Sequence, residues 1–290
     1  MGSTYYTRLD GTRFRPTAHV GGAWRADEQH FAPVAGLITH ALEQHAAGSG
    51  LQIGRLSFEI LGVIPAAVSE VVVETVRAGR TISLLEATMT VSDRPVVRAR
   101  AWLLSRQDTS AVAGGAPEPM PPPAELERWD GPGTWPGGYI GSLDIRRSAD
   151  AAPGRARAWI STDVELLADE PVAPLARFVG LVDTANGIAV RQPPGEWMFP
   201  NLDLTVHLHR QPVGGPGGAD PHGAAPRRSL TSGSVAHRTA AGRVLSSTGR
   251  RRLRPLPGRK GSFLRCAGRG RCRGWCRLRR PRSPRGGAPR

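Results

Sequence analysis

The sequence predicts an α+β protein in which one unit, a helix followed by an antiparallel sheet, occurs twice along the chain. Three observations lead to this prediction. Apolar residues recur at helical spacing over residues 30–45. Segments with strand character follow that helix, and the same order of elements returns after a stretch rich in proline and glycine.

The first half is expected to begin with an extended segment over residues 5–16 and to continue with the helix at 30–45. Within that helix, apolar side chains lie three or four positions apart, which places them on one face. They are Phe31, Val34, Leu37, Ile38, Ala41 and Leu42. Pro33 is compatible with a first helical turn, and the glycines at Gly48 and Gly50 mark the end of the helix.

Four strands are expected after this helix. They cover residues 56–65, 69–76, 81–91 and 96–106. Short turns at residues 78–80 and 93–95 join consecutive strands, which is typical of an antiparallel meander.

Residues 107–138 carry no periodicity and are rich in proline and glycine, which predicts a linker or a long surface connection. The first pattern then begins again. Strands are expected over residues 139–147, 155–162 and 201–212, with a helix over 172–187 before the last strand.

The duplication can be checked by register. Pro33 of the first helix recurs as Pro174, an offset of 141, and the strand that ends at Pro65 recurs as the one that ends at Pro212, an offset of 147. The difference of six residues lies in a longer loop between helix and strand in the second half. Matching element order and matching proline positions together indicate an internal repeat.

The composition changes sharply after residue 212. Residues 213–290 hold 20 Lys and Arg against one acid, so the first 212 residues carry a net charge of −4 although the whole chain carries +15. Only 10 of these 78 residues are Leu, Ile, Val or Phe, too few to bury a core. We therefore expect a disordered tail rich in Arg, Gly, Pro and Ala.

Two explanations of this tail stay open. The chain has one lysine against 38 arginines, which indicates GC-rich coding DNA, and such DNA read out of frame yields mostly Gly, Ala, Pro and Arg. We hypothesise a frameshift close to residues 213–215 that removed a second meander. The alternative is a genuine basic arm for nucleic acid or an acidic partner. The acidic body itself argues against a nucleic-acid partner.

Other sequence features exclude several classes of protein. The three cysteines all lie in the tail, at spacings that fit neither a paired zinc site nor a disulfide framework, so no metal is expected. No apolar segment is long enough to cross a membrane, and the N-terminus has no signal-peptide core. We expect a cytoplasmic protein.

Residues 22–44 and 200–212 resemble the type II, TesB-like acyl-CoA thioesterase family, and the resemblance extends over about residues 10–212. The family has the double hotdog fold. In this fold an antiparallel sheet wraps around a helix, the unit occurs twice in tandem, and the two units form one body. The resemblance implies a first hotdog repeat at 1–106, the linker at 107–138, a truncated second repeat at 139–212 and the tail at 213–290.

The family resemblance also implies site residues. Asp183 falls in the last turns of the second helix, where the first repeat has Leu42, and a carboxylate there would position the attacking water. Asn201 corresponds to a polar family residue, commonly threonine, that helps to hold this water. Thr205 is a third candidate. For Asp183, a solvent-facing place near a helix end is the alternative.

The strand that carries Asn201 alternates polar and aliphatic residues over 201–209. Such strict alternation puts every polar side chain on one face of the strand. For His207 and His209 a solvated outer face is the simplest interpretation. Trp24 and Trp197 are candidates for the lining of an acyl or pantetheine channel.

The function implied by the resemblance is hydrolysis of an acyl-CoA to free fatty acid and CoA, without a cofactor. The third member of the family site is a glutamine on a late strand, and no glutamine follows Gln211, so we expect weak or absent activity. A hotdog hydratase or dehydratase is one alternative, although no histidine follows Asp183 until His207. A non-catalytic acyl-CoA-binding protein with a nucleic-acid-binding tail is another. Acyl chain length and a homo-oligomeric state stay open.

Overall fold

The computed structural model of the chain describes residues 2–109, 111, 120–208 and 210–212. Beyond residue 212 it adds only the backbone of three short strands. These are β13 (Val235–Thr239), β14 (Gly242–Val244) and β15 (Arg254–Pro255). The rest of the predicted tail, with its three cysteines and the hypothetical frameshift point, lies outside the described residues, as does His209.

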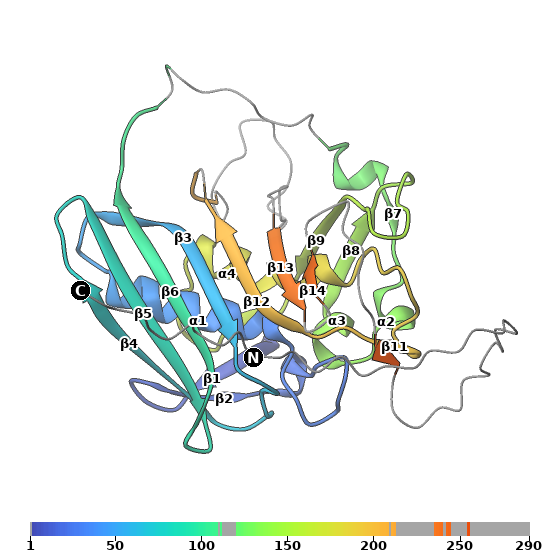
Figure 1. Ribbon diagram of the computed structural model, residues 1–290, viewed down its shortest axis with the longest axis horizontal. Coiled ribbons are helices and arrows are strands. Elements are labelled where there is room, and N and C mark those ends of the chain that lie inside the picture. The colour runs from blue at the N-terminus through green and yellow to red at the C-terminus, as the bar shows by residue number, and fades with distance from the viewer. Residues whose placement is uncertain are drawn as a thin grey trace, which may run out of the picture. The chain divides into compact units, whose positions relative to one another are not determined.

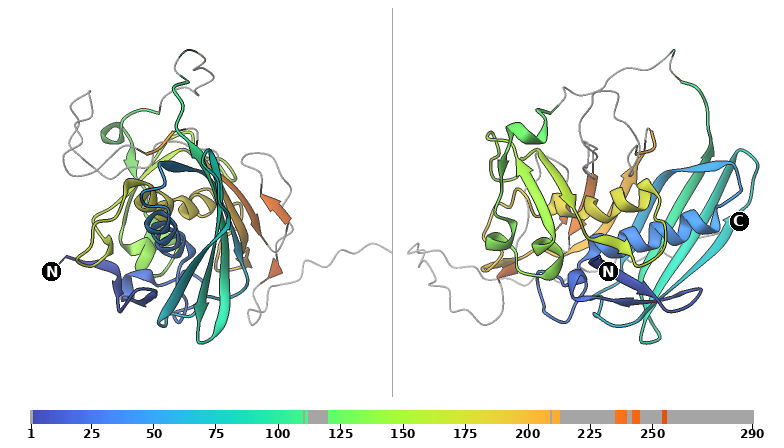
Figure 2. Two further views of the ribbon diagram at one scale, coloured as in Figure 1. Left: turned by 90° about the vertical axis from the view of Figure 1, so that its left-hand side faces the viewer. Right: turned by 180° about the vertical axis from the view of Figure 1, so that it is seen from behind.

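Among the described residues, ten strands form one sheet that curls around a central helix (Figures 1 and 2). In sheet order they are β10 (Glu165–Leu167), β1 (Thr4–Arg8), β2 (Arg13–Pro16), β4 (Ser69–Arg77), β5 (Ile82–Val91), β6 (Arg94–Ser105), β3 (Leu51–Ile60), β12 (Asn201–His207), β13 and β14. Neighbouring strands are antiparallel, except β1 and β10, which are parallel.

Two small sheets and several helices complete the described fold. The small sheets pair β7 (Glu127–Arg128), β8 (Leu143–Arg147) and β9 (Ala158–Thr162), and β11 (Trp197–Met198) with β15. The helices are α1 (Phe31–His45), α2 (Gly131–Thr134), α3 (Gly138–Gly141) and α4 (Pro174–Val182), with 3₁₀ helices η1 (Ala18–Val20), η3 (Pro123–Glu125) and η4 (Asp183–Asn186). The predicted α+β class is confirmed.

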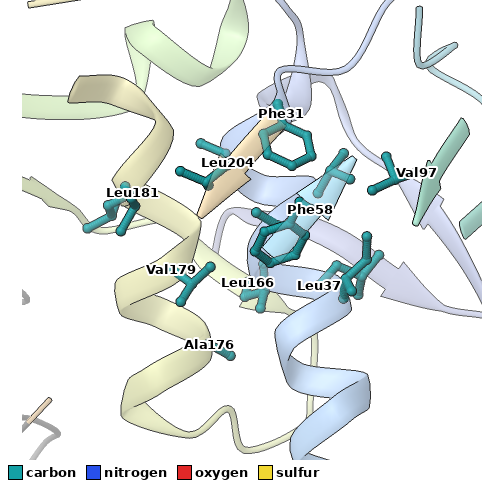
Figure 3. Packing of buried hydrophobic residues seen from close by; sticks show 14 of the residues in the cluster. Phe31, Leu37, Phe58, Val97, Leu166, Ala176, Val179, Leu181 and Leu204 are labelled. Atoms are coloured by element: carbon teal, nitrogen blue, oxygen red, sulfur yellow. The ribbon is translucent and has the colours of Figure 1, made fainter. Parts of the chain in front are cut away.

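The long helix α1 occupies the centre of the core. Its first eight residues are all buried, which is expected of a helix that is apolar around most of its circumference and is enclosed on several sides. Figure 3 shows Leu37 of α1 and Val179 of α4 beside Phe58 of β3 and Leu204 of β12. The core therefore joins the two helices to two adjacent strands of the sheet, β3 and β12.

The two helices cross in close contact. A Cβ atom added to Gly36 of α1 would lie 3.0 Å from the Cα atom of Gly180 in α4 and 3.1 Å from the carbonyl oxygen of Ala176. Backbones can approach this closely only where side chains are absent. The two glycines therefore set how near α1 and α4 can lie.

The adjacent strands β3 and β12 pair with each other in a symmetric register. Asp203 lies opposite Glu59, and Val206 lies opposite Leu56. The offset of 147 found in the sequence makes Asp203 equivalent to Leu56 and Val206 equivalent to Glu59. The pairing therefore exchanges equivalent positions, as in a twofold-symmetric contact, and it agrees with the internal repeat.

Local structure differs from the sequence predictions at several element boundaries, among them the start of β3, the predicted linker and the start of β8. The strand predicted over 56–65 begins earlier, at Leu51, because Leu51 to Ile53 pair with β6 although Gln52 and Gly54 interrupt the apolar pattern. The predicted linker contains α2 and part of α3 in its second half. The strand predicted over 139–147 starts only at Leu143, because Tyr139 belongs to α3 and is fully buried.

The strands beyond residue 212 were not predicted. The backbone of β13 pairs antiparallel with β12, with Asn201 opposite Thr239 and Val206 opposite Val235. β14 then pairs with β13. Part of the predicted tail thus continues the sheet on the side of the second repeat. The repeat and tail boundaries at residues 106, 138 and 212 stay predictions.

Candidate functional site

A cavity of about 320 Å³ lies where the end of α4, the start of α1 and the start of β12 meet. Its walls are mainly aliphatic and aromatic. The polar side chains that line it are Glu28, Gln29, His30, Asp183, Thr184, Asn186 and Asn201. A largely apolar pocket with a few convergent polar groups is the usual form of a small-molecule site.

Asp183 contributes a buried carboxyl to this cavity. It is the first residue of η4, directly after the last turn of α4, and its side chain is 6% exposed. The Nδ2 atom of Asn201 donates a hydrogen bond of 2.5 Å to its Oδ1. Burial raises the pKa of Asp183 to about 7, and the bond from Asn201 opposes that rise only in part. The carboxyl therefore changes charge near neutral pH.

Asn201 is held in one orientation by a second amide. The Nδ2 atom of Asn186 donates to Asn201 Oδ1 at 2.9 Å, which leaves the Nδ2 of Asn201 directed at Asp183. The chain of donors runs from Asn186 through Asn201 to the carboxyl. This arrangement fixes the amide that contacts Asp183.

The strict alternation predicted for this strand is wrong at its start. The pairing register with β13 shifts between Asn201 and Asp203, and Leu202 is 47% exposed while Asn201 turns toward Asp183. A β-bulge inserts one residue and redirects the side chains before it. From Leu204 onward the expected alternation holds, since Leu204 and Val206 are buried.

Thr205 and His207 lie farther along the same strand. Thr205 stands opposite Ser57 of β3, and His207 stands opposite Arg55 and is exposed. Thr205 lies four residue steps beyond Asn201, about 13 Å along an extended strand, and it does not line the cavity. The structure brings together Asp183 and Asn201 but not Thr205.

His30 of the first repeat faces Asp183 of the second, and the sequence analysis did not single it out. It is the N-cap of α1, and its Nδ1 accepts a hydrogen bond of 3.1 Å from the backbone N–H of Ala32. The same Nδ1 lies 3.7 Å from Asp183 Oδ2. Burial lowers the pKa of His30 to about 3, so the imidazole is neutral at physiological pH.

Tyr139 supports both sides of this pair. Its ring stacks on the imidazole of His30 with 4.2 Å between centroids. Its hydroxyl donates to the carbonyl oxygen of Gly180 at 3.0 Å and lies 2.8 Å from Thr184 Oγ1. Tyr139 therefore contacts both His30 and the end of α4 next to Asp183.

Glu28 is a second carboxylate in the cavity wall, but its contacts are structural. Its Oε1 accepts hydrogen bonds from the backbone N–H groups of Trp24 and Arg25, and burial is the main cause of its raised pKa. Trp24 lines the cavity and meets Trp135 edge to face, 5.0 Å between centroids. Trp197 does not line this cavity.

Two negative findings apply to the part of the chain that the structure describes. It holds no cluster of three or more His, Cys, Asp or Glu side chains suited to bind a metal ion. It also holds no helix that is both long and apolar enough to cross a lipid bilayer.

Known structures share this architecture. A hot dog fold protein from Alicyclobacillus acidocaldarius matches with a TM-score of 0.55 at 19% identity, over 71% of this chain and 76% of its own. A candidate thioesterase from Novosphingobium aromaticivorans matches with a TM-score of 0.55 at 18% identity, over 83% and 94%. A candidate thioesterase II from Thermobifida fusca matches with a TM-score of 0.52 at 15% identity, over 83% and 91%. These likenesses define a protein of the double hotdog fold.

The sequence itself identifies the family. Residues 20–104 match the model of the acyl-CoA thioesterase N-terminal domain, and residues 117–223 match the model of the acyl-CoA thioesterase C-terminal domain. The chain therefore belongs to the TesB-like acyl-CoA thioesterase family. No curated protein is similar enough to count as a match.

Proposed function

We propose that this thioesterase hydrolyses an acyl-CoA thioester to a free fatty acid and CoA, using a water molecule positioned by Asp183 and Asn201. The observation behind this proposal is the carboxyl of Asp183, which is buried in the wall of an apolar cavity and titrates at about pH 7. A general base works best when its pKa lies near the operating pH.

Each residue has a separate part in the proposed reaction. The carboxylate of Asp183 accepts a proton from water as the water oxygen attacks the thioester carbonyl carbon. Asn201 holds the carboxylate through its Nδ2 atom and is itself held by Asn186. The apolar walls receive the acyl chain.

The family resemblance implies a glutamine on a late strand as a third member of the site, and without it turnover should be slow. No glutamine follows Gln211 in the sequence. Gln29 lines the cavity, but its Oε1 accepts from the Tyr6 hydroxyl at 2.8 Å and its Nε2 donates to the Pro65 carbonyl at 2.8 Å. Its amide is therefore already occupied and is poorly placed to hold a substrate water.

Release of free CoA thiol from acyl-CoA substrates of graded chain length tests the proposal. Asp183→Asn keeps the shape of the side chain but removes the base, so the rate should fall by about 100-fold or more. The wild-type rate should rise as the pH passes about 7, where the carboxyl ionises. Asp163→Asn changes an exposed carboxylate outside the cavity and should leave the rate unchanged. Equal rates for both variants would refute the assignment of Asp183.

One observation bears on the hydratase alternative. A histidine, His30, does lie beside Asp183 in space, although it comes from the other repeat. Its Nδ1 is engaged with the backbone of Ala32, however, which removes that nitrogen from proton transfer. Incubation with a 2-enoyl-CoA separates the two activities, because hydration consumes the double bond while hydrolysis releases thiol. Binding of acyl-CoA with neither reaction would favour a non-catalytic binding protein.

A further inference from the structure

The two ring nitrogens of His30 have different surroundings. Nδ1 accepts the N–H of Ala32 at the start of α1. Within the described residues Nε2 has no hydrogen-bond partner, and the side chain lines the cavity. The side chain is 15% exposed, so one edge of the ring can meet a bound molecule.

The hydrogen bond to Ala32 also fixes where the proton sits. A nitrogen that accepts a hydrogen bond must present its lone pair, and a neutral imidazole carries its single proton on the other nitrogen. His30 stays neutral because burial lowers its pKa to about 3. The proton of His30 is therefore on Nε2, and this N–H is a donor.

The position of the donor is set before any substrate binds. The imidazole is attached at the N-cap of a buried helix and stacked on Tyr139, whose hydroxyl is bonded to Gly180 and Thr184. Fixed donors of this kind stabilise developing negative charge without the free-energy cost of reorienting during the reaction.

We propose that His30 is a catalytic residue that donates its Nε2–H to the carbonyl oxygen of the bound thioester. This inference rests on the proposed thioesterase function. Asp183 takes a proton from water, the water oxygen bonds to the carbonyl carbon, and the carbonyl oxygen becomes negative against His30. The carbon–sulfur bond then breaks, CoA leaves as the thiolate, and the proton held by Asp183 passes to it.

The imidazole donates a hydrogen bond throughout and does not transfer its proton. A second proton on Nδ1 would break the cap on Ala32. The two repeats thus contribute different groups to the proposed site. Asp183 of the second repeat accepts and returns the proton, and His30 of the first repeat stabilises the oxyanion.

Two substitutions separate this role from helix capping. Asparagine is a strong N-cap, so His30→Asn should keep the bond to Ala32 while its shorter side chain withdraws the donor from the cavity. His30→Ala removes both. We expect both variants to lose about 100- to 1000-fold in kcat, with thermal stability lowered mainly in His30→Ala. A wild-type kcat in a folded His30→Asn variant would overturn the proposal.

Binding of two inert analogues tests His30 independently of turnover. One is a ketone in which CH₂ replaces the thioester sulfur, and the other is an alkyl thioether of CoA without the carbonyl. His30→Asn should weaken binding of the ketone by about tenfold or more, the value of a lost hydrogen bond in a dry site, and leave the thioether unaffected. Equal effects on both would overturn the role of His30. A wild-type protein that binds both but releases no thiol would instead refute the hydrolytic function.

A measurement on the unmodified side chain covers the case in which the variants fail to fold. In wild-type protein labelled with ¹⁵N-histidine, the Nε2 resonance of His30 should shift when the ketone binds and stay in place when the thioether binds. A resonance that responds equally to both ligands contradicts a hydrogen bond to the carbonyl.

Discussion

The carboxyl of Asp183 remains protonated in the folded protein up to about pH 7, because burial outweighs the hydrogen bond that Asn201 donates to it. Its ordinary pKa is 3.8, so ionisation at neutral pH costs the folded state free energy that the unfolded chain does not lose. A buried carboxyl of this kind therefore lowers the stability of the folded state near neutral pH.

Replacement of Asp183 by asparagine should therefore change how stability depends on pH. The folded pKa is raised, so the contribution of Asp183 is fully retained below pH 3.8 and lost as the pH rises through about 7. Between about pH 4 and about pH 8, wild type should lose on the order of 2 to 4 kcal/mol relative to Asp183→Asn. Urea denaturation of both proteins measures this difference. Parallel stability curves would contradict the raised pKa.

Two of the three side chains that meet at the cavity, Asp183 and Asn201, were named from the sequence, and the third, His30, was missed for a physical reason. Asp183 and Asn201 were assigned from a family resemblance, and the structure joins them. The turn of Asn201 toward Asp183 depends on a bulge that alternation cannot reveal. His30 precedes a helix in the other repeat, and only the folding of the two repeats against each other brings it to Asp183. The placement of Thr205 in the site stays an unsupported prediction.

At the scale of elements, the approach of α1 to α4 depends on Gly36. An added Cβ would lie 3.0 Å from Gly180 Cα and 3.1 Å from Ala176 O, and neither backbone atom can move freely. Gly36→Ala should therefore destabilise the protein by about 1 to 3 kcal/mol, the usual cost of overpacking. It should also lower thiol release, because α1 carries His30 and α4 leads to Asp183.

Gly141→Ala provides the matched control for this helix crossing. Gly141 is also a helical residue, the last of α3, but an added Cβ there would meet nothing within 4 Å. Chemical denaturation should show wild-type stability for Gly141→Ala and a lower midpoint for Gly36→Ala. Equal midpoints would mean that the helices can separate without cost.

Elements with strong local periodicity were predictable, and elements fixed by tertiary contact were not. The helix predicted over 30–45 and the strands of the first meander are confirmed, with shifted ends. The helix α3 was missed because the burial of Tyr139 against His30, not a local pattern, determines it. Propensity over four residues is too weak to indicate such a short helix.

At the scale of the whole molecule, the core that the structure describes lies within the first 212 residues. Among the residues with described side chains, every buried member of the core cluster lies at or before Val206. Residues 213–290 contribute described structure only through short strands, of which β13 borders β12. The two explanations of the tail therefore predict different effects of its removal. A frameshifted tail can be removed without loss of binding, whereas removal of a basic arm should weaken binding of nucleic acid or an acidic partner.

Truncation after residue 212 should leave the protein folded but make β12 an edge strand of the sheet. The core that the structure describes lies in the retained residues, so a cooperative thermal transition should persist. Strand β12 loses its neighbour β13 and presents unpaired backbone groups. Unpaired edges promote association, and size-exclusion chromatography should show more self-association than in the full chain. A truncated chain without a cooperative transition would show that the tail is needed for folding. Loss of nucleic-acid affinity on truncation would support the basic arm.

The symmetric pairing of β3 with β12 has a consequence for how the site persists at low protein concentration. Two separate subunits that met across such a dyad would dissociate on dilution, and a cavity shared between them would vanish with the dimer. Because both halves here are one polypeptide, His30 and Asp183 stay together however dilute the protein becomes. Covalent linkage also frees each half to diverge, so that one keeps a leucine where the other carries the acid.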